Sequence, residues 1–123
     1  MNYFKVLFIS VLVSMCSVSY ADNHSPTFYP IEVFGCTYNE NQGLDDLLRV
    51  ADEWNKWADN NFSKPYAAWV LVPGYVNSDS VTNDVAWVGI SNSFEDLGTV
   101  QDEMASKGQR LQAKFDKVTT CKD

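Results

Sequence analysis

The sequence lacks the patterns that most metal, nucleotide and hydrolytic sites require. His24 is the single histidine, and no Cys-x-x-Cys or His-x-x-x-His spacing is present to hold a metal ion. The six glycines are scattered, so no phosphate-binding loop is indicated, and there is no Gly-x-Ser-x-Gly elbow. A Ser-His-Asp triad would have to recruit His24 from a polar, proline-bearing segment, where we expect a solvent-exposed side chain. These absences argue against metalloenzyme, nucleotide-binding and hydrolase functions.

Basic residues are also scarce. Nine Lys and Arg stand against sixteen Asp and Glu, which gives a formal net charge of −7. Phosphate backbones and anionic lipid surfaces repel an acidic domain, so we expect no nucleic-acid partner and no membrane association of the processed chain. A charge of this size keeps a small domain soluble and needs no functional explanation.

The amino-terminal 21 residues are typical of a signal peptide. Lys5 supplies the basic start, residues 6–13 are apolar, and residues 19–21 offer small side chains for cleavage after Ala21. A membrane anchor is the alternative, but the apolar run is short and no basic cluster follows it. A lipoprotein signal would need a smaller residue before Cys16. We therefore predict a protein exported to the periplasm or secreted.

Cleavage would leave two of the three cysteines, Cys36 and Cys121. In an oxidising compartment such a pair is most simply a disulfide. The loop-entropy model assigns a closure of this length about 4–5 kcal/mol. A redox-active thiol pair is the alternative, and it usually has closer spacing.

The chain after the signal peptide predicts one domain over residues 31–123, preceded by a flexible lead-in over 22–30. Residues 31–38 alternate as a first strand, and a helix follows the turn at 39–43 and ends before Pro65. One helical stripe is expected to be buried, and a second stripe of Val50, Trp54 and Trp57 packs either under a neighbouring loop or against a partner subunit. The first stripe contains Leu44, Leu47, Leu48, Ala51, Trp54, Asn55, Ala58 and Phe62.

Two β-branched and aromatic runs between residues 66 and 90 predict a β-hairpin with a polar tip at 77–80. If the hairpin is symmetrical about Ser78, Trp69 lies opposite Trp87. Both faces of this hairpin are then apolar. One carries Ala68, Val70, Val72, Ala86, Val88 and Ile90, and the other carries Ala67, Trp69, Leu71, Val85, Trp87 and Gly89.

A second helix is expected after Ser93, with Asp96 at the capping-box position and Gly108 just past its end. Leu111 and Phe115 indicate one further helical turn or two, and residues 117–121 form a last short strand. The order βαββαβ is that of a ferredoxin-like α+β sandwich, a four-stranded antiparallel sheet with two main helices on one face. Its fourth strand lies beside the first, which would bring the two cysteines together.

A doubly apolar sheet needs a cover on its second face. We assign the aliphatic face to the helices and the Trp69/Trp87 face to a second copy of the chain, which predicts a homodimer. The alternative is that residues 109–116 fold over that face.

Several motifs carry a family resemblance: Cys36-x-Tyr38-Asn39-x-x-x-Gly43, Trp54-Asn55-x-Trp57, Ala68-Trp69-Val70-Leu71-x-Pro73 and Asp84-Val85-Ala86-Trp87-Val88-Gly89. They resemble small exported proteins of marine bacteria, and the domain resembles the dimeric α/β-barrel superfamily, which includes antibiotic-biosynthesis-type monooxygenases, NIPSNAP-like proteins and stress-responsive barrel proteins. The resemblance implies a small organic molecule or haem between helices and sheet, or a cofactor-free oxygenase. Haem-binding members generally use a ligating histidine, so with only His24 we expect no cofactor.

The candidate binding residues are polar and aromatic side chains near the strand ends, which would orient a small amphipathic ligand: Tyr38, Asn39, Glu40, Trp69, Tyr75, Asp84 and Trp87. Asn39 and Trp87 are the pair for a cofactor-free oxidation. Ordinary turn, capping and core roles are the alternatives. Three functions remain open on the sequence: a small-molecule-binding module, a cofactor-independent oxygenase or isomerase, and a purely structural envelope protein.

Overall fold

A computed structural model describes residues 27–77 and 79–122, an α+β arrangement of one open, four-stranded antiparallel sheet and three helices. The predicted signal peptide and His24 lie outside these residues. Within the described ranges, no helix is long and apolar enough to cross a membrane. The strands are β1 (Ile31–Tyr38), β2 (Tyr66–Leu71), β3 (Val85–Ser91) and β4 (Thr119–Lys122), and the helices are α1 (Leu44–Asn61), α2 (Phe94–Lys107) and α3 (Gln109–Val118).

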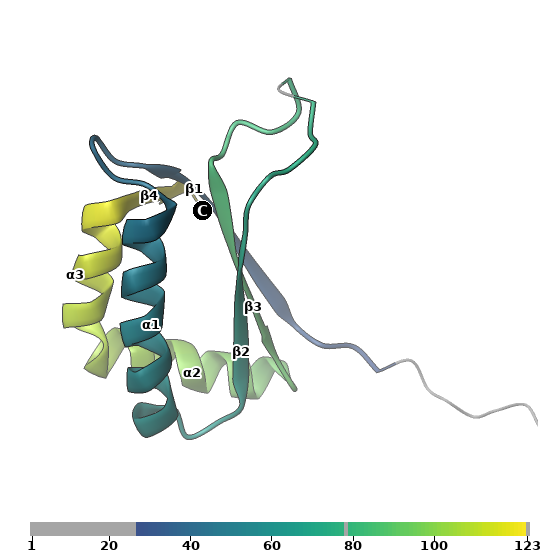
Figure 1. Cartoon of the computed structure of the whole chain (residues 1–123). Coiled ribbons are helices and arrows are strands. Elements are labelled where there is room, and N and C mark those ends of the chain that lie inside the picture. The colour runs from purple at the N-terminus through teal and green to yellow at the C-terminus, as the bar shows by residue number, and fades with distance from the viewer. Residues whose placement is uncertain (1–26, 78, 123) are drawn as a thin grey trace, which may run out of the picture.

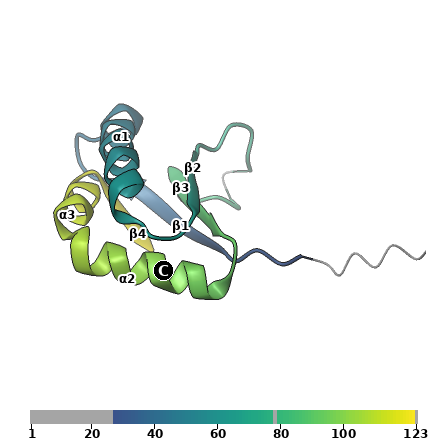
Figure 2. The ribbon, with the colours of Figure 1, turned by 90° about the horizontal axis from the view of Figure 1, so that it is seen from below.

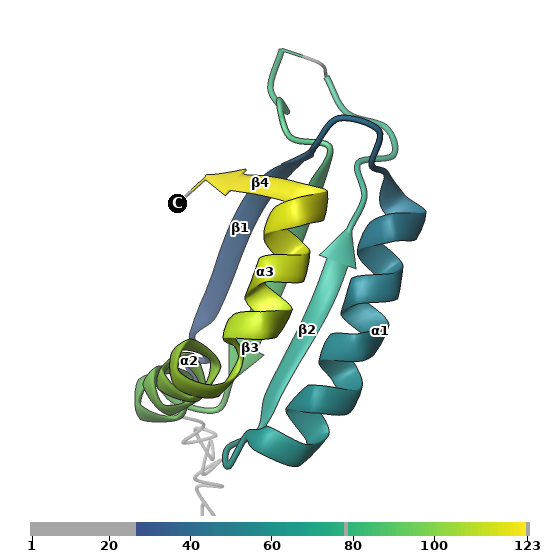
Figure 3. The ribbon, with the colours of Figure 1, turned by 90° about the vertical axis from the view of Figure 1, so that its left-hand side faces the viewer.

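All three helices lie on one face of the sheet, whose strand order is β2-β3-β1-β4 (Figure 1). α1 and α3 run side by side in front of the strands, and α2 crosses beneath them (Figures 2 and 3). α3 extends over ten residues, so the further turn or two expected around Leu111 and Phe115 is a full third helix. The alternative that residues 109–116 cover the Trp69/Trp87 face holds only for Trp87: Phe115 of α3 contacts Trp87, whereas Trp69 remains half exposed.

Local sequence signals explain where α2 begins and ends. Ser93 Oγ accepts the Asp96 amide N–H at 3.1 Å, which caps the first turn. Gly108 ends α2 and starts α3, and a Cβ added there would lie 2.4 Å from the Met104 sulfur and 2.7 Å from its carbonyl oxygen. Only glycine fits this corner without a shift in Met104. The corner turns α3 away from the line of α2, as Figure 3 shows.

The buried stripe of α1 is rotated from the predicted one. Leu47, Val50 and Trp54 are buried, whereas Leu48 and Asn55 are exposed. The reason is the third helix, because α1 packs against α3 as well as the sheet. The Val50–Trp54 stripe therefore packs inside its own domain, and neither a loop nor a partner is needed to cover it.

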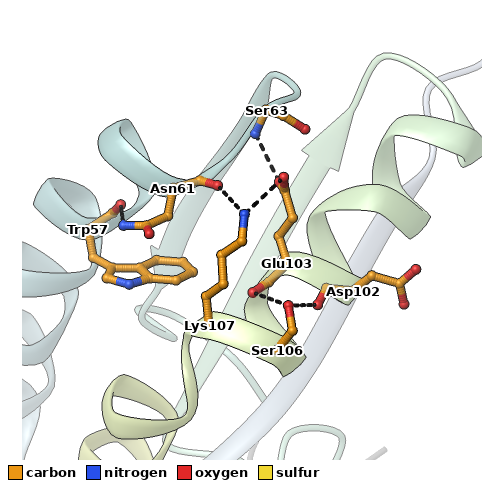
Figure 4. Close-up of polar contacts among 7 residues, drawn as sticks. All are labelled: Trp57, Asn61, Ser63, Asp102, Glu103, Ser106 and Lys107. Carbon is orange, nitrogen blue, oxygen red and sulfur yellow. Dashed lines mark hydrogen bonds and ion pairs between the residues drawn. The ribbon is translucent and has the colours of Figure 1, made fainter.

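Polar contacts tie the end of α1 to α2 (Figure 4). The Ser63 amide N–H donates to Glu103 Oε2 at 2.9 Å, and Lys107 Nζ lies 3.5 Å from both Glu103 Oε1 and the Asn61 carbonyl oxygen. The Ser63 N–H holds the pKa of the Glu103 carboxyl below its usual value, and the Lys107 charge adds to this effect. Lys107 also places a positive charge at the negative end of the α1 dipole.

The β2–β3 register differs by one residue from the predicted one. Trp69 lies opposite Val88, and Val70 lies opposite Trp87. Because side chains alternate between faces, a shift of one residue moves Trp69 and Trp87 to opposite sides of the sheet. The predicted Trp69/Trp87 face therefore does not exist. Trp87 faces the helices, and Trp69 is half exposed on the open face.

The Cys36–Cys121 disulfide joins β1 to β4, as predicted from the pairing of the first and fourth strands. The two cysteines are direct register partners in the antiparallel ladder. β4 has only four residues, so the disulfide supplements a short set of ladder hydrogen bonds at this edge of the sheet.

Replacing both cysteines, Cys36→Ala with Cys121→Ala, is expected to lower the free energy of unfolding by about 4 kcal/mol, because the unfolded chain regains the entropy of an open loop. Urea denaturation measures the change. Reduction of the disulfide in the wild-type protein is the matched control, and it should lower the free energy of unfolding by a similar amount. An unchanged urea midpoint in both would contradict a stabilising role for the disulfide.

Candidate ligand-binding cavity

A cavity of about 710 Å³ lies between the helices and the sheet. All four strands and all three helices contribute lining residues. The volume falls within the range of about 300–1,000 Å³ that small-molecule sites occupy. The lining includes six aromatic side chains: Phe34, Trp54, Phe62, Tyr66, Trp87 and Phe115.

The cavity opens on the side of α2 and α3. Ala105 on α2 and Gln112, Ala113 and Asp116 on α3 line the cavity and are also solvent-exposed. The lining residues from β3 and α1 are buried or half-buried. Met104 and Gln109, on either side of the Gly108 corner between α2 and α3, also line the cavity.

Edge-to-face contacts hold the aromatic wall together. The Trp54 ring lies 5.0 Å from that of Trp87 and 5.7 Å from that of Tyr66, measured between centroids. Trp87 contacts Phe115 at 5.4 Å, and Trp54 contacts Phe62 at 5.8 Å, each in a T-shaped arrangement. Such pairs contribute about 0.5–1.5 kcal/mol each beyond the burial of their area. The rings are therefore fixed by one another rather than free to close the cavity.

One polar cluster interrupts this apolar wall. The Trp87 indole N–H donates to the Tyr66 hydroxyl at 3.3 Å, and that hydroxyl donates to Glu32 Oε1. Gln101 Nε2 donates to the other carboxylate oxygen, Glu32 Oε2, at 2.8 Å. The cluster thus joins β3, β2, β1 and α2 through a single half-buried carboxylate.

Gly89 makes room for this cluster. It pairs with Glu32 on β1 and with Ala68 on β2, so it lies between the strands that carry Glu32 and Tyr66. A Cβ at Gly89 would stand 1.9 Å from the Tyr66 hydroxyl oxygen and 2.4 Å from the adjoining ring carbon. The absent side chain lets the tyrosine cross β3 and reach the carboxylate.

The phenol of Tyr66 is held in its protonated form. Burial raises the pKa of Tyr66 well above its usual value, and the hydrogen bond to Glu32 raises it further. The hydrogen bond from Trp87 acts in the opposite direction and is outweighed. Tyr66 is therefore a donor to Glu32 at neutral pH.

Of the seven predicted binding residues, Trp87 alone lines the cavity. Trp69 lies on the opposite face of the sheet, Tyr75 is fully exposed in the β2–β3 connection, and Glu40 is exposed in the turn after β1. The sequence grouped these residues by strand ends, but the strand residues that line the cavity are those on the sheet face toward the helices. Asn39 and Trp87 are therefore not brought together as a catalytic pair.

The other predicted residues have structural partners at the end of β1. Asp84 Oδ2 accepts the Tyr38 amide N–H at 2.8 Å, and burial, with a smaller effect of Asp84, raises the pKa of the Tyr38 phenol. Asn39 Nδ2 donates to the Asp116 carbonyl at 2.9 Å, and Asn39 Oδ1 accepts from Thr120 Oγ1 at 2.7 Å. These bonds fasten the turn after β1 to the junction of α3 and β4.

Glu32, Tyr66 and Gln101 are site residues that were not predicted from the sequence. One signal was available, because Glu32 alternates onto the same strand face as Phe34 and Cys36 and is therefore an acid on an inward, apolar face. Tyr66 gave no such signal, since its side chain reaches the carboxylate only over Gly89.

Comparisons with known proteins add no further identification: no protein-family model, curated protein or solved structure matches this chain.

The Tyr66→Phe variant is expected to lose about 1–2 kcal/mol of stability at neutral pH, because the Trp87 N–H loses its acceptor and Glu32 loses a donor. The difference in stability between the wild-type protein and the Tyr66→Phe variant should become smaller in alkaline solution. The folded-state pKa of Tyr66 lies above that of an unfolded tyrosine, about 10. The unfolded chain therefore releases this proton first, and wild-type stability falls as pH rises past about 10. Urea denaturation across this pH range measures both effects.

Tyr75→Phe is the matched control, because Tyr75 is fully exposed and should change neither the stability nor its alkaline dependence. If the Tyr66→Phe and Tyr75→Phe variants have the same free energy of unfolding and the same pH dependence, the hydrogen-bonded role of Tyr66 is contradicted.

Proposed function

We propose that this protein is an exported module that binds a small apolar or aromatic molecule in the cavity between its helices and its sheet. The observation that carries the proposal is the cavity of about 710 Å³, with six aromatic side chains and one convergent polar cluster. A concave apolar site with a few placed polar groups is the usual form of a small-molecule site. The disulfide supports export, because such bonds persist in oxidising compartments.

We further infer that the domain is ferredoxin-like and related to the dimeric α/β barrels. The element order, with α3 added before β4, and the sheet order β2-β3-β1-β4 support this inference. The position of the cavity between helices and sheet also agrees with the location of ligands in that superfamily. The helix α3 is the departure from the two-helix plan.

The open face of the sheet is the proposed homodimer interface. Val33, Val88 and Trp69 form one row across β1, β3 and β2, with Ile31 and Leu71 on the same face. Val33 is 57% exposed and Trp69 is 51% exposed. β1, β2 and β3 place no charged residue on this face, and β4 places only Lys122 there, opposite Gly35, so the acidic residues of two copies do not meet in this interface. If two sheets packed face to face, each would bury the apolar side chains that are exposed on the other.

The alternatives have less support. A cofactor-independent oxygenase or isomerase needs a reacting pair, and Asn39 is engaged at the α3–β4 junction. A purely structural protein has no use for a cavity of this size. Binding is therefore the function we propose.

Ligand binding is tested with the neutral fluorescent probe N-phenyl-1-naphthylamine and the purified protein. We expect saturable binding that Ala113→Trp weakens by about tenfold or more, since an indole at the mouth blocks entry while the core is untouched. Arg110→Trp is the matched control, because this exposed α3 residue does not line the cavity. Absence of saturable binding to the wild-type protein would sink the proposed function.

The dimer is tested by size-exclusion chromatography with light scattering. We expect twice the subunit mass for the wild-type protein and the monomer mass for Trp69→Glu, because a charge in the middle of the apolar row resists desolvation. Leu48→Glu, an exposed apolar residue on α1, should leave the dimer intact. A monomeric wild-type protein at micromolar concentration contradicts the interface without affecting ligand binding.

A further inference from the structure

The charged residues that line the cavity are of one sign, although α3 also carries Arg110, Lys114 and Lys117 outside the lining. Glu32 and Asp116 are the only charged residues among the described side chains that line it. Glu32 lies in the polar cluster of the wall, and Asp116 lies at the exposed mouth on α3. The whole chain carries a net charge of −7, so its long-range field attracts cations and repels anions.

In the polar cluster, the N–H of Trp87 and the O–H of Tyr66 are already engaged, as is one of the two N–H groups of the Gln101 amide. The indole N–H of Trp87 donates to Tyr66, the phenol of Tyr66 donates to Glu32, and Gln101 donates to the second carboxylate oxygen. All three point toward one carboxylate, directly or through Tyr66. An anion entering the cavity therefore finds a negative charge and no free Trp87 or Tyr66 donor, whereas a cation finds carboxylate oxygens with unshared electron pairs.

The aromatic residues beside the carboxylate suit a positive charge with an apolar body. Tyr66 and Trp87 belong to the polar cluster, and Trp54 lies 5.0 Å from Trp87 and 5.7 Å from Tyr66. Tryptophan and tyrosine rings attract organic cations through their negative faces, and the attraction is strongest where water is excluded. A carboxylate among aromatic rings is thus a site for a weakly hydrated cation.

We propose that the ligand is an organic cation, an ammonium-bearing molecule whose charge lies beside Glu32 and whose apolar body occupies the aromatic cavity. This assignment rests on the proposed binding function and names its ligand class. Glu32 supplies the charge selection, and the aromatic wall supplies the apolar contact. Asp116 adds a negative charge at the entrance.

The test compares three naphthyl probes on the purified protein: naphthylmethyl-trimethylammonium, its neutral neopentyl isostere, and a naphthyl carboxylate. Each displaces N-phenyl-1-naphthylamine from the cavity. We expect the cation to bind roughly tenfold or more tightly than the neutral isostere, and the carboxylate to bind least. Glu32→Gln keeps the shape and an acceptor for Tyr66, and it should remove the preference for the cation while the neutral isostere binds as before.

Glu95→Gln is the matched control, since it removes one negative charge from an exposed position of α2 outside the cavity and should leave the preference intact. Equal affinity for the cation and the neutral isostere overturns the cation assignment and leaves the proposed binding function standing. A cation preference that survives in Glu32→Gln overturns the role of Glu32. If no probe binds and the reporter itself does not bind, the proposed function fails as well.

Discussion

The pairing register of β2 with β3 determines which side chains line the cavity and which remain on the open face. With Val70 opposite Trp87, the indole of Trp87 turns toward the helices, contacts Trp54 and Phe115, and donates to Tyr66. A shift by one residue would place Trp69 and Trp87 on the same face of the sheet. The aromatic wall and the half-exposed Trp69 are two results of the same pairing.

The remaining contacts keep a space open above this face. The disulfide fastens β4 to β1, Asn39 fastens the turn after β1 to the end of α3, and the Gly108 corner sets α3 at an angle to α2. α3 therefore stands over the sheet without closing on α2. Gly89 completes the arrangement, because its missing side chain lets Tyr66 reach Glu32.

Much of the fold could be predicted from local sequence, because its signals are local. The Ser93 cap and the break at Gly108 follow from single residues or short spacings, and the disulfide follows from there being two cysteines after the predicted signal peptide. The pairing register of β2 with β3 could not be predicted from the sequence, for two physical reasons. Both faces of the hairpin are apolar, so the pattern does not say which one is buried, and the connection over residues 72–84 is too long for turn geometry to fix the pairing.

The site was harder to predict because its parts meet only in three dimensions. Glu32, Tyr66 and Gln101 come from β1, β2 and α2, and no spacing in the sequence links them. The rotated stripe of α1 has a similar cause, since the full length of α3 was not evident from Leu111 and Phe115.

The most direct test of this account is a set of backbone nuclear Overhauser effects across β2 and β3 in isotope-labelled protein. The account predicts cross-strand contacts between Val70 and Trp87, between Ala68 and Gly89, and between Trp69 and Val88. Direct pairing of Trp69 with Trp87 would contradict it, because both tryptophans would then lie on the same face of the sheet.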